Sequence, residues 1–577
     1  MQSRPMGRLR ISSRRHGTVE RMMTLEQQAA PASRALPDTR PARRPVGRWL
    51  VPLLVAVLLG QMAVAMVTTA VQQTPTIDEP VYVGTAAEYL HEHRVVHNPE
   101  HPPLGKLVVG VGVALADPQV DPSFTGDQGR LGRHLLYESG NDPWRLMLFA
   151  RLPVIALTLG FGLIVFAFAR ELAGSVGGLV ALGLYAFSPD VIAHGSLATL
   201  DVPAAGFVLT AVWLLWRARH RPRLYVPLAG VALGAALATK MSTLAAVPVL
   251  AALAGLSVWC ARVPAESRRR ALGRAAVGAG VVTLVAIAVV WASYLVVDPR
   301  LRWAPEQPVP VVRGLRGLAV DLLPFPEAYR DGMRVQFRFE NHPWEGFLFG
   351  RLYTGSLWYY LPAALLVKTP LGMLALWAAG AVTVVAVRGL RPVAPYLLLP
   401  AAVLLGAAML GSRDFGTRYA VFVPMFLAVA AGCVLAVRWR WAPVAAGALV
   451  LFVAVSSLRT YPYYLPYSNE AFGGPAKTRL RLHDSNVDWG QDLGRLADRL
   501  RERYRGERIW LVYKGSGVPS HYGIRAADPR EVPADEVRGL LVVSASSVAK
   551  ATGRLAELID SSRPVDTVGH SITIYRR

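Results

Sequence analysis

Long apolar runs recur between residues 49 and 458 of the chain, and short basic segments separate several of them. A helix needs about 20 apolar residues to cross the hydrocarbon core of a membrane, and local thinning of the bilayer or tilt accommodates other lengths. The pattern therefore predicts a polytopic α-helical membrane protein with about 11 transmembrane helices. The predicted spans are Trp49–Val71, Leu146–Ala169, Val176–Ser188, Val202–Trp216, Leu224–Thr239, Leu244–Trp259, Ala275–Val297, Pro370–Val387, Pro395–Leu410, Tyr419–Val437 and Ala442–Val455.

The basic segments between these runs predict the orientation of the chain. Arginines gather at Arg217–Arg223, Arg262–Arg274, Arg388–Arg391 and Arg438–Arg440. If the N-terminus lies in the cytoplasm, all of these clusters fall on the cytoplasmic side, in agreement with the positive-inside rule. An odd number of spans then places the C-terminus outside.

The N-terminal segment, residues 1–48, carries 11 arginines against Glu20, Glu26 and Asp38 and has no apolar period. This composition predicts a disordered basic cytoplasmic tail. The tail is too long for the n-region of a cleaved signal peptide, so the first apolar run is interpreted as a signal anchor.

Three larger pieces are expected outside: loop 72–145, loop 298–369 and residues 459–577. The last of these differs in pattern from the membrane region 49–458, because short alternating segments replace the long apolar runs. It has a helix-like segment followed by strand-like ones and is predicted to be a small α/β domain. These segments are Leu493–Tyr504, Ile509–Tyr513, Leu540–Val543 and Ser571–Tyr575.

Composition supports this picture. Of the 577 residues, 53% are hydrophobic and 18% charged, which excludes a conventional soluble enzyme and a disordered chain. A net charge of +23 would indicate nucleic acid in a soluble chain, but here much of the excess lies between apolar runs. Cys260 and Cys433 lie at inner ends of apolar runs and imply no disulfide framework. The Ala- and Arg-rich composition indicates high-GC coding and a bacterial plasma membrane.

The first outer loop carries the candidate chemistry. Asp78 and Glu79 follow the first span directly, and a box from His97 to Lys106 (His-Asn-Pro-Glu-His-Pro-Pro-Leu-Gly-Lys) comes later in the same loop. Adjacent carboxylates are costly to desolvate at a membrane face, so they indicate a functional site. The alternative is that they cap a juxtamembrane helix that begins at Pro80.

An Asp-Glu pair after the first span, followed by His-Pro-Pro-Leu-x-Lys, resembles the GT-C glycosyltransferases of the protein O-mannosyltransferase type, family 39. Bacterial lipid A aminoarabinose transferases are relatives of that family. The resemblance extends over most of the membrane region and into the tail, where Asp484–Leu493 is similar to a signature of bacterial phospholipid-carrier-dependent transferases. Further matching boxes are Leu200–Pro203, Thr239-Lys240, Trp358–Tyr360, Lys368–Pro370 and Arg418-Tyr419.

The resemblance implies transfer of a sugar from a polyprenyl-phosphate carrier to an acceptor hydroxyl, with inversion. Asp78 would be the general base, and Glu79 an orienting or acceptor-binding partner. Fixed cations would stabilise the leaving lipid phosphate. The candidates are Lys106, Lys240 and Arg418.

Each of these cations could instead be an interfacial residue that snorkels to the membrane surface. Asp201 is expected to orient one of the cations or contact the sugar, although it could also be an N-cap ahead of Pro203. Tyr82 is placed with the substrate-orienting residues of the same loop.

A metal site was tested on His93, His97 and His101, which recur every four residues. Prolines in the following box break the helix that would put them on one face. No metal or cofactor is therefore predicted, and His101 is expected to hydrogen-bond within the His-Pro-Pro turn. The chain also lacks glycine-rich nucleotide motifs, so the sugar should arrive from the lipid side.

In the tail motif, Asp488 and Trp489 have two interpretations. The run can be a turn that caps a helix starting near Gln491, or it can recognise acceptor or sugar.

The expected partners are a polyprenyl-phosphate-linked sugar and an acceptor protein, glycan or lipid, with no nucleic acid. Two other functions fit a polytopic basic chain, namely a lipid-carrier transporter or flippase and a non-catalytic carrier-binding protein. A transporter should have ionisable positions near mid-bilayer and related halves. The candidate positions here lie at outer ends of spans, which favours the enzyme.

Overall fold

The computed structural model describes residues 46–261, 266–305 and 307–577. The chain divides between Arg48 and Trp49, and Trp49–Arg577 forms one compact unit that includes the C-terminal residues. The predicted basic tail lies almost wholly outside the described residues, as do residues 262–265 of one basic cluster.

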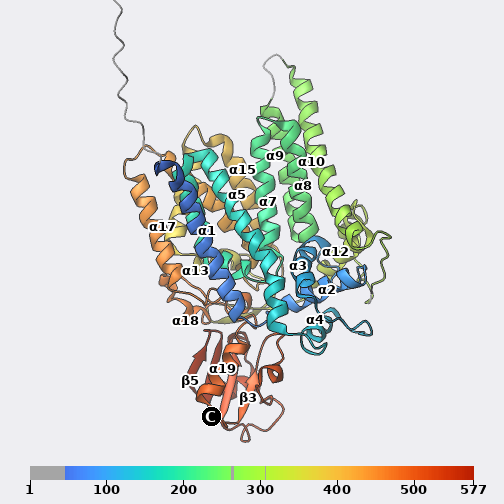
Figure 1. Cartoon of the computed structure of the whole chain (residues 1–577), viewed down its shortest axis with the longest axis vertical. Coiled ribbons are helices and arrows are strands. Elements are labelled where there is room, and N and C mark those ends of the chain that lie inside the picture. The colour runs from blue at the N-terminus through green and yellow to red at the C-terminus, as the bar shows by residue number, and fades with distance from the viewer. Residues whose placement is uncertain (1–45, 262–265, 306) are drawn as a thin grey trace, which may run out of the picture. The chain divides into compact units, whose positions relative to one another are not determined.

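The membrane region is helical, as predicted, and each predicted apolar run lies on helix (Figure 1). Its α-helices are α1 (Val46–Gln72), α5 (Pro143–Ala186), α6 (Pro189–Gly195), α7 (Asp201–Ala218), α8 (Pro222–Thr239), α9 (Val247–Cys260), α10 (Arg268–Val297), α13 (Tyr360–Lys368), α14 (Leu371–Ala386), α15 (Ala394–Met409), α16 (Phe422–Gly432) and α17 (Ala442–Leu458). Short 3₁₀ turns η1 (Met241–Ala246), η2 (Arg391–Val393), η3 (Thr417–Ala420) and η4 (Cys433–Ala436) adjoin them.

Within the described ranges, 6 helices are long and apolar enough to cross a membrane, and 7 if the pair α13 and α14, bent by 120°, is one span. Of the other predicted spans, Val202–Trp216 lies on α7, which is as long as α8 but is not among the six, and two lie on the shorter helices α16 and α17. The spans Leu146–Ala169 and Val176–Ser188 share the single element α5. The fold is therefore that of a polytopic helical membrane protein, while the expected number of spans is not established.

The element α5 contains two of the predicted spans. Its helical geometry breaks at Ala173 and Gly174, where Gly174 adopts φ +74°. The second leg folds back on the first, since the Tyr185 hydroxyl donates a hydrogen bond to the Thr158 carbonyl at 2.7 Å. The sequence interpretation of two separate apolar helices therefore holds.

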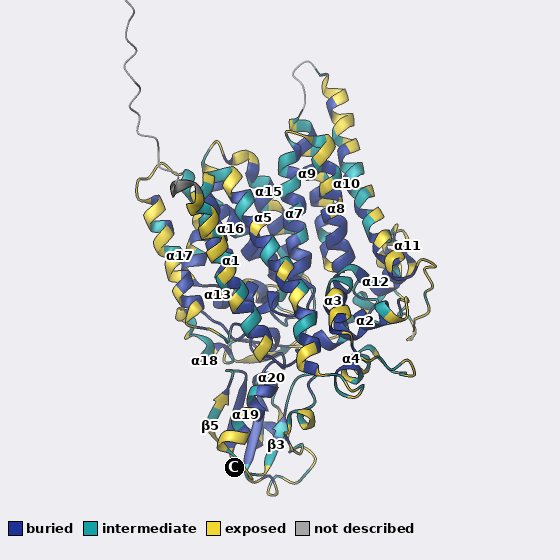
Figure 2. Cartoon of the chain, viewed as in Figure 1, coloured by how far each residue is buried: buried dark blue, intermediate teal, exposed yellow. Residues whose placement is uncertain are grey.

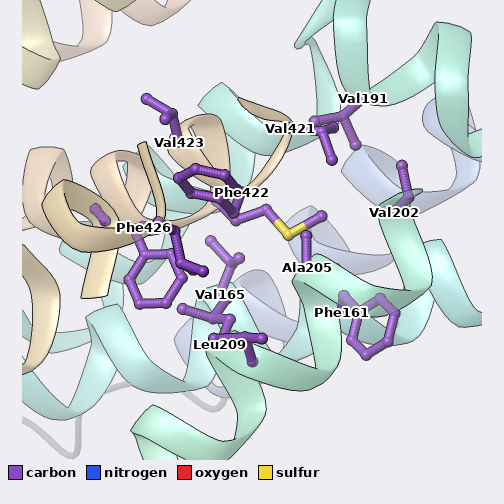
Figure 3. Packing of buried hydrophobic residues seen from close by; sticks show 14 of the residues in the cluster. Phe161, Val165, Val191, Val202, Ala205, Leu209, Val421, Phe422, Val423 and Phe426 are labelled. Carbon is purple, nitrogen blue, oxygen red and sulfur yellow. The ribbon is translucent and has the colours of Figure 1, made fainter. Parts of the chain in front are cut away.

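The helical core is built from small and aromatic side chains. Figure 3 shows Phe161 and Val165 of α5 beside Leu209 of α7 and Phe422 and Phe426 of α16. The outer faces are apolar but exposed (Figure 2), as expected for surfaces that meet lipid rather than water. Examples are Leu53 and Val64 on α1, Val277 and Leu284 on α10, and Val444 and Leu451 on α17.

Between the helices, two predicted loops fold into short elements near the C-terminal domain (Figure 1). The first loop forms α2 (Glu79–His91), α3 (Pro103–Ala116) and α4 (Gln128–Tyr137). The second forms α11 (Gly314–Asp321), α12 (Glu327–Glu340) and the hairpin of β1 (Glu345–Leu348) and β2 (Arg351–Thr354). We call this end of the helical region the domain end.

The C-terminal residues form the predicted α/β domain. Four strands pair in the order β3-β4-β6-β5, with β3 parallel to β4 and the other pairs antiparallel. Leucines of α19 pack on one face of the sheet and those of α21 on the other. The elements are η5 (Glu470–Phe472), α18 (Pro475–Thr478), η6 (Asp484–Asn486), α19 (Leu493–Arg503), β3 (Ile509–Val512), η7 (Pro519–Tyr522), β4 (Leu540–Ser544), α20 (Ala545–Ala549), α21 (Gly553–Asp560), β5 (Arg563–Val568) and β6 (Ile572–Arg576).

Candidate functional site

A cavity of about 780 Å³ lies at the domain end of the helical region. It brings together five residues singled out in the sequence, although they come from distant parts of the chain. Residues of α12 and of the segment 407–415 complete its wall. The five are Asp78, Tyr82, His101, Lys240 and Arg418.

A smaller cavity of about 190 Å³ adjoins the first and shares Lys240, Arg418 and Tyr419 with it. Its remaining wall is mostly apolar and comes from the helices α7, α15 and α16. Asp201 stands at its polar end. The polar cavity thus shares part of its wall with a mostly apolar cavity between helices, which we call the apolar groove.

Asp78 is the N-terminal flanking residue of α2, but its side chain makes no capping hydrogen bond to that helix. Its Oδ2 instead accepts a hydrogen bond from Arg418 Nη1 at 2.5 Å, across 340 positions of sequence. The Asp78 side chain is 27% exposed and that of Arg418 10%. Helix capping, one of the two interpretations of this carboxylate, is therefore wrong, and Asp78 belongs to a cavity-lining ion pair.

Lys240 and Asp201 form a second ion pair beside the first. Tyr419 lies between the two cations: the Lys240 ammonium is 5.2 Å and the Arg418 guanidinium carbon 4.9 Å from the centre of its ring. The electron-rich face of an aromatic ring attracts cations, so Tyr419 helps to hold both side chains at one wall. The sequence places Tyr419 in a family-like box at the start of a predicted span, but gives it no role at the site.

Further charged groups on this wall were not singled out in the sequence. Arg413 Nη2 donates to Glu340 Oε1 at 2.8 Å, and both residues line the cavity. Glu100 also lines it, where it accepts a hydrogen bond from Gln128 Nε2 at 2.7 Å. The cavity is therefore rich in paired charges of both signs.

Glu79 lies behind the cavity rather than in it, and its carboxylate is fully buried. Arg151 of α5 grips it through two hydrogen bonds, Nε to Oε1 and Nη2 to Oε2, both 2.7 Å long. Backbone N–H groups of Thr76 and Ala198 donate to the same carboxylate at 2.9 and 2.8 Å. This network leaves the carboxylate no access to the cavity, and its contacts fix the loop that carries Asp78.

Burial by itself raises the pKa of Glu79, but the Arg151 charge and the hydrogen bonds outweigh burial and hold that pKa below its ordinary value. Glu79 thus anchors the segment as a charged carboxylate at neutral pH. Arg151 is not among the residues singled out in the sequence. The signal available was a lone arginine inside an otherwise apolar predicted span, because such residues are expensive unless paired.

Lys106 also lies behind the cavity wall and is fully buried. Its ammonium donates to the backbone carbonyls of Asn98 and His101 at 2.8 and 2.7 Å. These contacts tie down the His-Pro-Pro turn, and Lys106 does not line the cavity formed by the other candidates.

His101 packs edge-on against Tyr82, with ring centres 5.7 Å apart. Burial and the charges of Lys240 and Lys106 hold the pKa of His101 well below its ordinary value, so its ring is neutral. His93 and His97 do not share a helix face with it, because α2 ends at His91. Across the described ranges, no three His, Cys, Asp or Glu side chains are grouped so as to hold a metal ion.

The tail motif does not cap the helix after it. That helix, α19, is flanked by Asp492, which makes no side-chain capping hydrogen bond, so the capping interpretation is wrong. Trp489 instead stacks under Arg418, with the guanidinium carbon 4.4 Å from the ring centre. Asp488 accepts a hydrogen bond from the Ser546 N–H at 3.0 Å within the C-terminal domain. Neither residue lines the cavity.

Residues 55–297 match the family model described as dolichyl-phosphate-mannose-protein mannosyltransferase. This match confirms the family 39 resemblance over a region that includes Asp78, Lys106, Asp201 and Lys240. The matched residues make up less than half of the chain. No curated protein matches the chain in sequence.

Several solved structures are similar in fold. ArnT from Cupriavidus metallidurans in the apo state is 15% identical, with 92% of this chain and 98% of that chain covered and a TM-score of 0.45. The same protein bound to undecaprenyl phosphate is 14% identical, with 91% and 97% covered and a TM-score of 0.46. The Pmt1-Pmt2 protein O-mannosyltransferase of S. cerevisiae, bound to the sugar donor, is 19% identical, with 44% and 33% covered and a TM-score of 0.34.

Proposed function

We propose that the protein transfers a sugar from a polyprenyl-phosphate carrier to an acceptor hydroxyl, with inversion at the anomeric carbon and Asp78 as the general base. The observation that carries the proposal is that Asp78, Arg418 and Lys240 line one cavity, and that Arg418 and Lys240 also line the adjoining apolar groove. The family match to transferases that use dolichyl-phosphate-mannose supports the same class of donor.

The carrier phosphate is placed at Arg418 and Lys240, which share the wall between cavity and groove. A guanidinium can bind a phosphate through two parallel hydrogen bonds, and an ammonium adds a compact charge. Asp201 holds Lys240 in position through their ion pair. The lipid chain would follow the apolar groove, in contact with Ala205, Val208 and other small side chains.

The reaction needs one proton acceptor and one stabilised leaving group. The Asp78 carboxylate takes the proton of the acceptor hydroxyl, whose oxygen attacks the anomeric carbon from the face opposite the phosphate. The bond from that carbon to the phosphate oxygen breaks, and its electron pair leaves with the carrier phosphate. The charges of Arg418 and Lys240 stabilise this phosphate.

Arg418 links the two halves of this reaction. In the structure its guanidinium is paired with Asp78. A phosphate that engages the guanidinium competes with this pair and frees the carboxylate to act as a base. Carrier binding would therefore prepare the base. In this proposal Glu79 and Lys106 are positioning residues: Glu79 fixes the segment before Asp78, and Lys106 fixes the His-Pro-Pro turn.

The proposal is tested with the purified full chain in detergent. It is offered a panel of short-chain polyprenyl-phosphate hexoses and pentoses with mixed protein, glycan and lipid acceptors, and released polyprenyl phosphate is measured. We expect release from at least one donor and its loss in Asp78→Asn. Asp498→Asn, on the exposed face of α19, is the matched control and should retain wild-type release.

Two results would contradict the proposal. Full activity of Asp78→Asn would overturn the assignment of the base. No release from any donor, with carrier still bound, would favour a carrier transporter or a non-catalytic carrier-binding protein.

A further inference from the structure

One segment of the C-terminal domain, Asp484–Asp492, is buried along its whole length although it consists mainly of polar residues. Buried polar groups need hydrogen-bond partners, and the partners of this segment lie on the membrane region as well as in its own domain. The segment therefore connects two parts of the molecule.

On one side the segment binds the chain that leads into Asp78. The backbone N–H of Ile77 donates to the Trp489 carbonyl at 3.0 Å, and that of Thr74 donates to the Gln491 carbonyl at 3.0 Å. The Thr74 hydroxyl adds a hydrogen bond to the Gly490 carbonyl, also at 3.0 Å. These contacts hold the residues before Asp78 to the C-terminal domain.

On the other side the segment binds the chain that leads into Arg418. The Ser485 hydroxyl donates to the Phe415 carbonyl at 2.7 Å, and the backbone N–H of Thr417 donates to Asn486 Oδ1 at 3.1 Å.

The approach of these two chains is close. A Cβ atom on Gly416 would come within 2.3 Å of the Ser485 hydroxyl oxygen, so this contact depends on glycine at position 416. The segments before the base and before the cation are therefore both fixed to the same nine residues.

Trp489 contacts both the chain that leads into Asp78 and Arg418 itself. Its carbonyl accepts the Ile77 N–H, one position before Asp78, and its ring lies 4.4 Å from the Arg418 guanidinium carbon. The ring is fully buried, so it has a single packed position.

The segment is itself anchored in the C-terminal domain through Ser546, at the start of α20. The Ser546 N–H donates to Asp488 Oδ2 at 3.0 Å, and its hydroxyl donates to the Asp488 carbonyl at 3.1 Å. The Asp484 N–H donates to the same hydroxyl at 3.0 Å. Because the segment is fixed to its own domain, it can hold the two chains that it contacts in place instead of moving with them.

We propose that Asp484–Asp492 is a brace that sets the position of Asp78 relative to Arg418, and that Trp489 is its positioning residue. The inference rests on the proposed function for its catalytic consequence, because it assigns the C-terminal domain a part in the transfer without contact with substrate. The position of Asp78 relative to Arg418 can be tested without measuring transfer.

The first test compares turnover of purified, folded variants with the donor that the wild type uses. Trp489→Leu should lower kcat by about 10- to 100-fold, since misplacement of catalytic groups by about 1 Å costs that much. Trp489→Phe should recover most of the loss, because it keeps an aromatic face under Arg418. Trp510→Phe removes a fully buried indole from the same domain and serves as the control, with kcat unchanged.

Ser546→Ala gives an independent variant if Trp489→Leu does not fold. It loosens the anchor without touching either side of the site, and a smaller fall in kcat is expected. Wild-type kcat in Trp489→Leu, or in Ser546→Ala where the first does not fold, would overturn the brace.

The second test does not depend on turnover. Asp78→Cys, combined with Cys260→Ser, places a thiol beside Arg418, and its alkylation rate is followed against pH. The guanidinium should hold the thiol pKa below the ordinary value of about 8.5, and Trp489→Leu should return it toward that value. If the thiol pKa is lowered and Trp489→Leu restores it, but the wild type turns over no donor, the brace would be supported and the proposed function would be overturned. An unchanged profile in Trp489→Leu would overturn the brace alone.

Discussion

Asp78 and Glu79 are neighbours in sequence, and their surroundings differ completely. Asp78 faces a cavity and is paired with Arg418, which lines the same cavity. Glu79 is fully buried and gripped by Arg151. The difference arises because consecutive side chains at the start of a helix point in different directions, one toward the cavity and one toward α5.

The Glu79–Arg151 pair gives a prediction about stability. Arg151→Met leaves a buried carboxylate without its charge partner, and we expect a loss of about 3–5 kcal/mol in the free energy of unfolding. The double variant with Glu79→Gln removes the unpaired charge and should recover much of that loss. Thermal unfolding in detergent at one scan rate would measure both. Additive effects of the two substitutions would show that the residues are not coupled.

Asp488 gives a prediction about pH. Burial raises the pKa of this carboxyl from 3.8 to about 6, although the Ser546 N–H and the Lys514 charge oppose the rise. A raised pKa means that the folded state favours the protonated form, so stability is lost as pH rises through about 6. Asp488→Asn lacks this titration. We therefore expect its melting temperature to rise relative to wild type between pH 4 and 7, and a constant difference would contradict the assignment.

For single residues, the sequence indicated which charged side chains lie at the ends of spans, but not which side chains they pair with. Asp78, Lys240 and Arg418 each adjoin an apolar run, and the positive-inside rule put them on one side of the membrane. The pairing of Asp78 with Arg418 could not be derived, because it depends on how helices far apart in the chain pack. The contacts of Lys106 could not be derived either. Nothing in the His-Pro-Pro-Leu-Gly-Lys box indicates that its ammonium donates hydrogen bonds to backbone carbonyls of the preceding turn instead of facing the cavity.

At the scale of elements, apolar runs predicted the helices well because lipid requires every backbone polar group to be paired within a helix. Periodicity could not show that the two legs of α5 pack against each other, or that α13 and α14 meet at 120°. Those features depend on contacts with other helices. The short elements of the first outer loop were also beyond reach, because α2, α3 and α4 pack on one another and on α5 in a separate apolar cluster that includes Val83, Val109 and Leu135.

Glycines at one crossing of α5 and α16 lead to a further prediction. A Cβ on Gly432 would lie 2.5 Å from the Gly177 carbonyl oxygen, so Gly432→Ala should force the helices apart and cost about 1–3 kcal/mol. Gly447→Ala on the exposed face of α17 is the control, since a Cβ there meets no atom within 4 Å. Melting temperatures in detergent distinguish the two. Equal values would mean that the crossing is not tightly packed.

At the scale of the whole molecule, the arginine clusters and the site lie at opposite ends of the helices. Cys260 ends α9 at the end away from the C-terminal domain, as Figure 1 shows, and is exposed. The orientation predicted from the sequence puts this end in the cytoplasm.

This orientation can be tested with a membrane-impermeant thiol reagent on intact cells. We expect Cys260 to be protected until the cells are opened. A thiol placed by Arg525→Cys in the C-terminal domain should be labelled at once. Labelling of Cys260 in intact cells would show that the predicted orientation is wrong.

The buried contacts of Asp484–Asp492 also have a consequence for how the protein is made. Chains leave the ribosome from the N-terminus onward, so Asp78 is synthesised before Arg418, and the residues that hold both come after Arg418. A nascent or prematurely ended chain can insert its helices and contain the base and the cations, yet lack the part that fixes them. If the brace is needed for the proposed transfer, a chain that stops before Asp484 should be inactive even with its helices inserted.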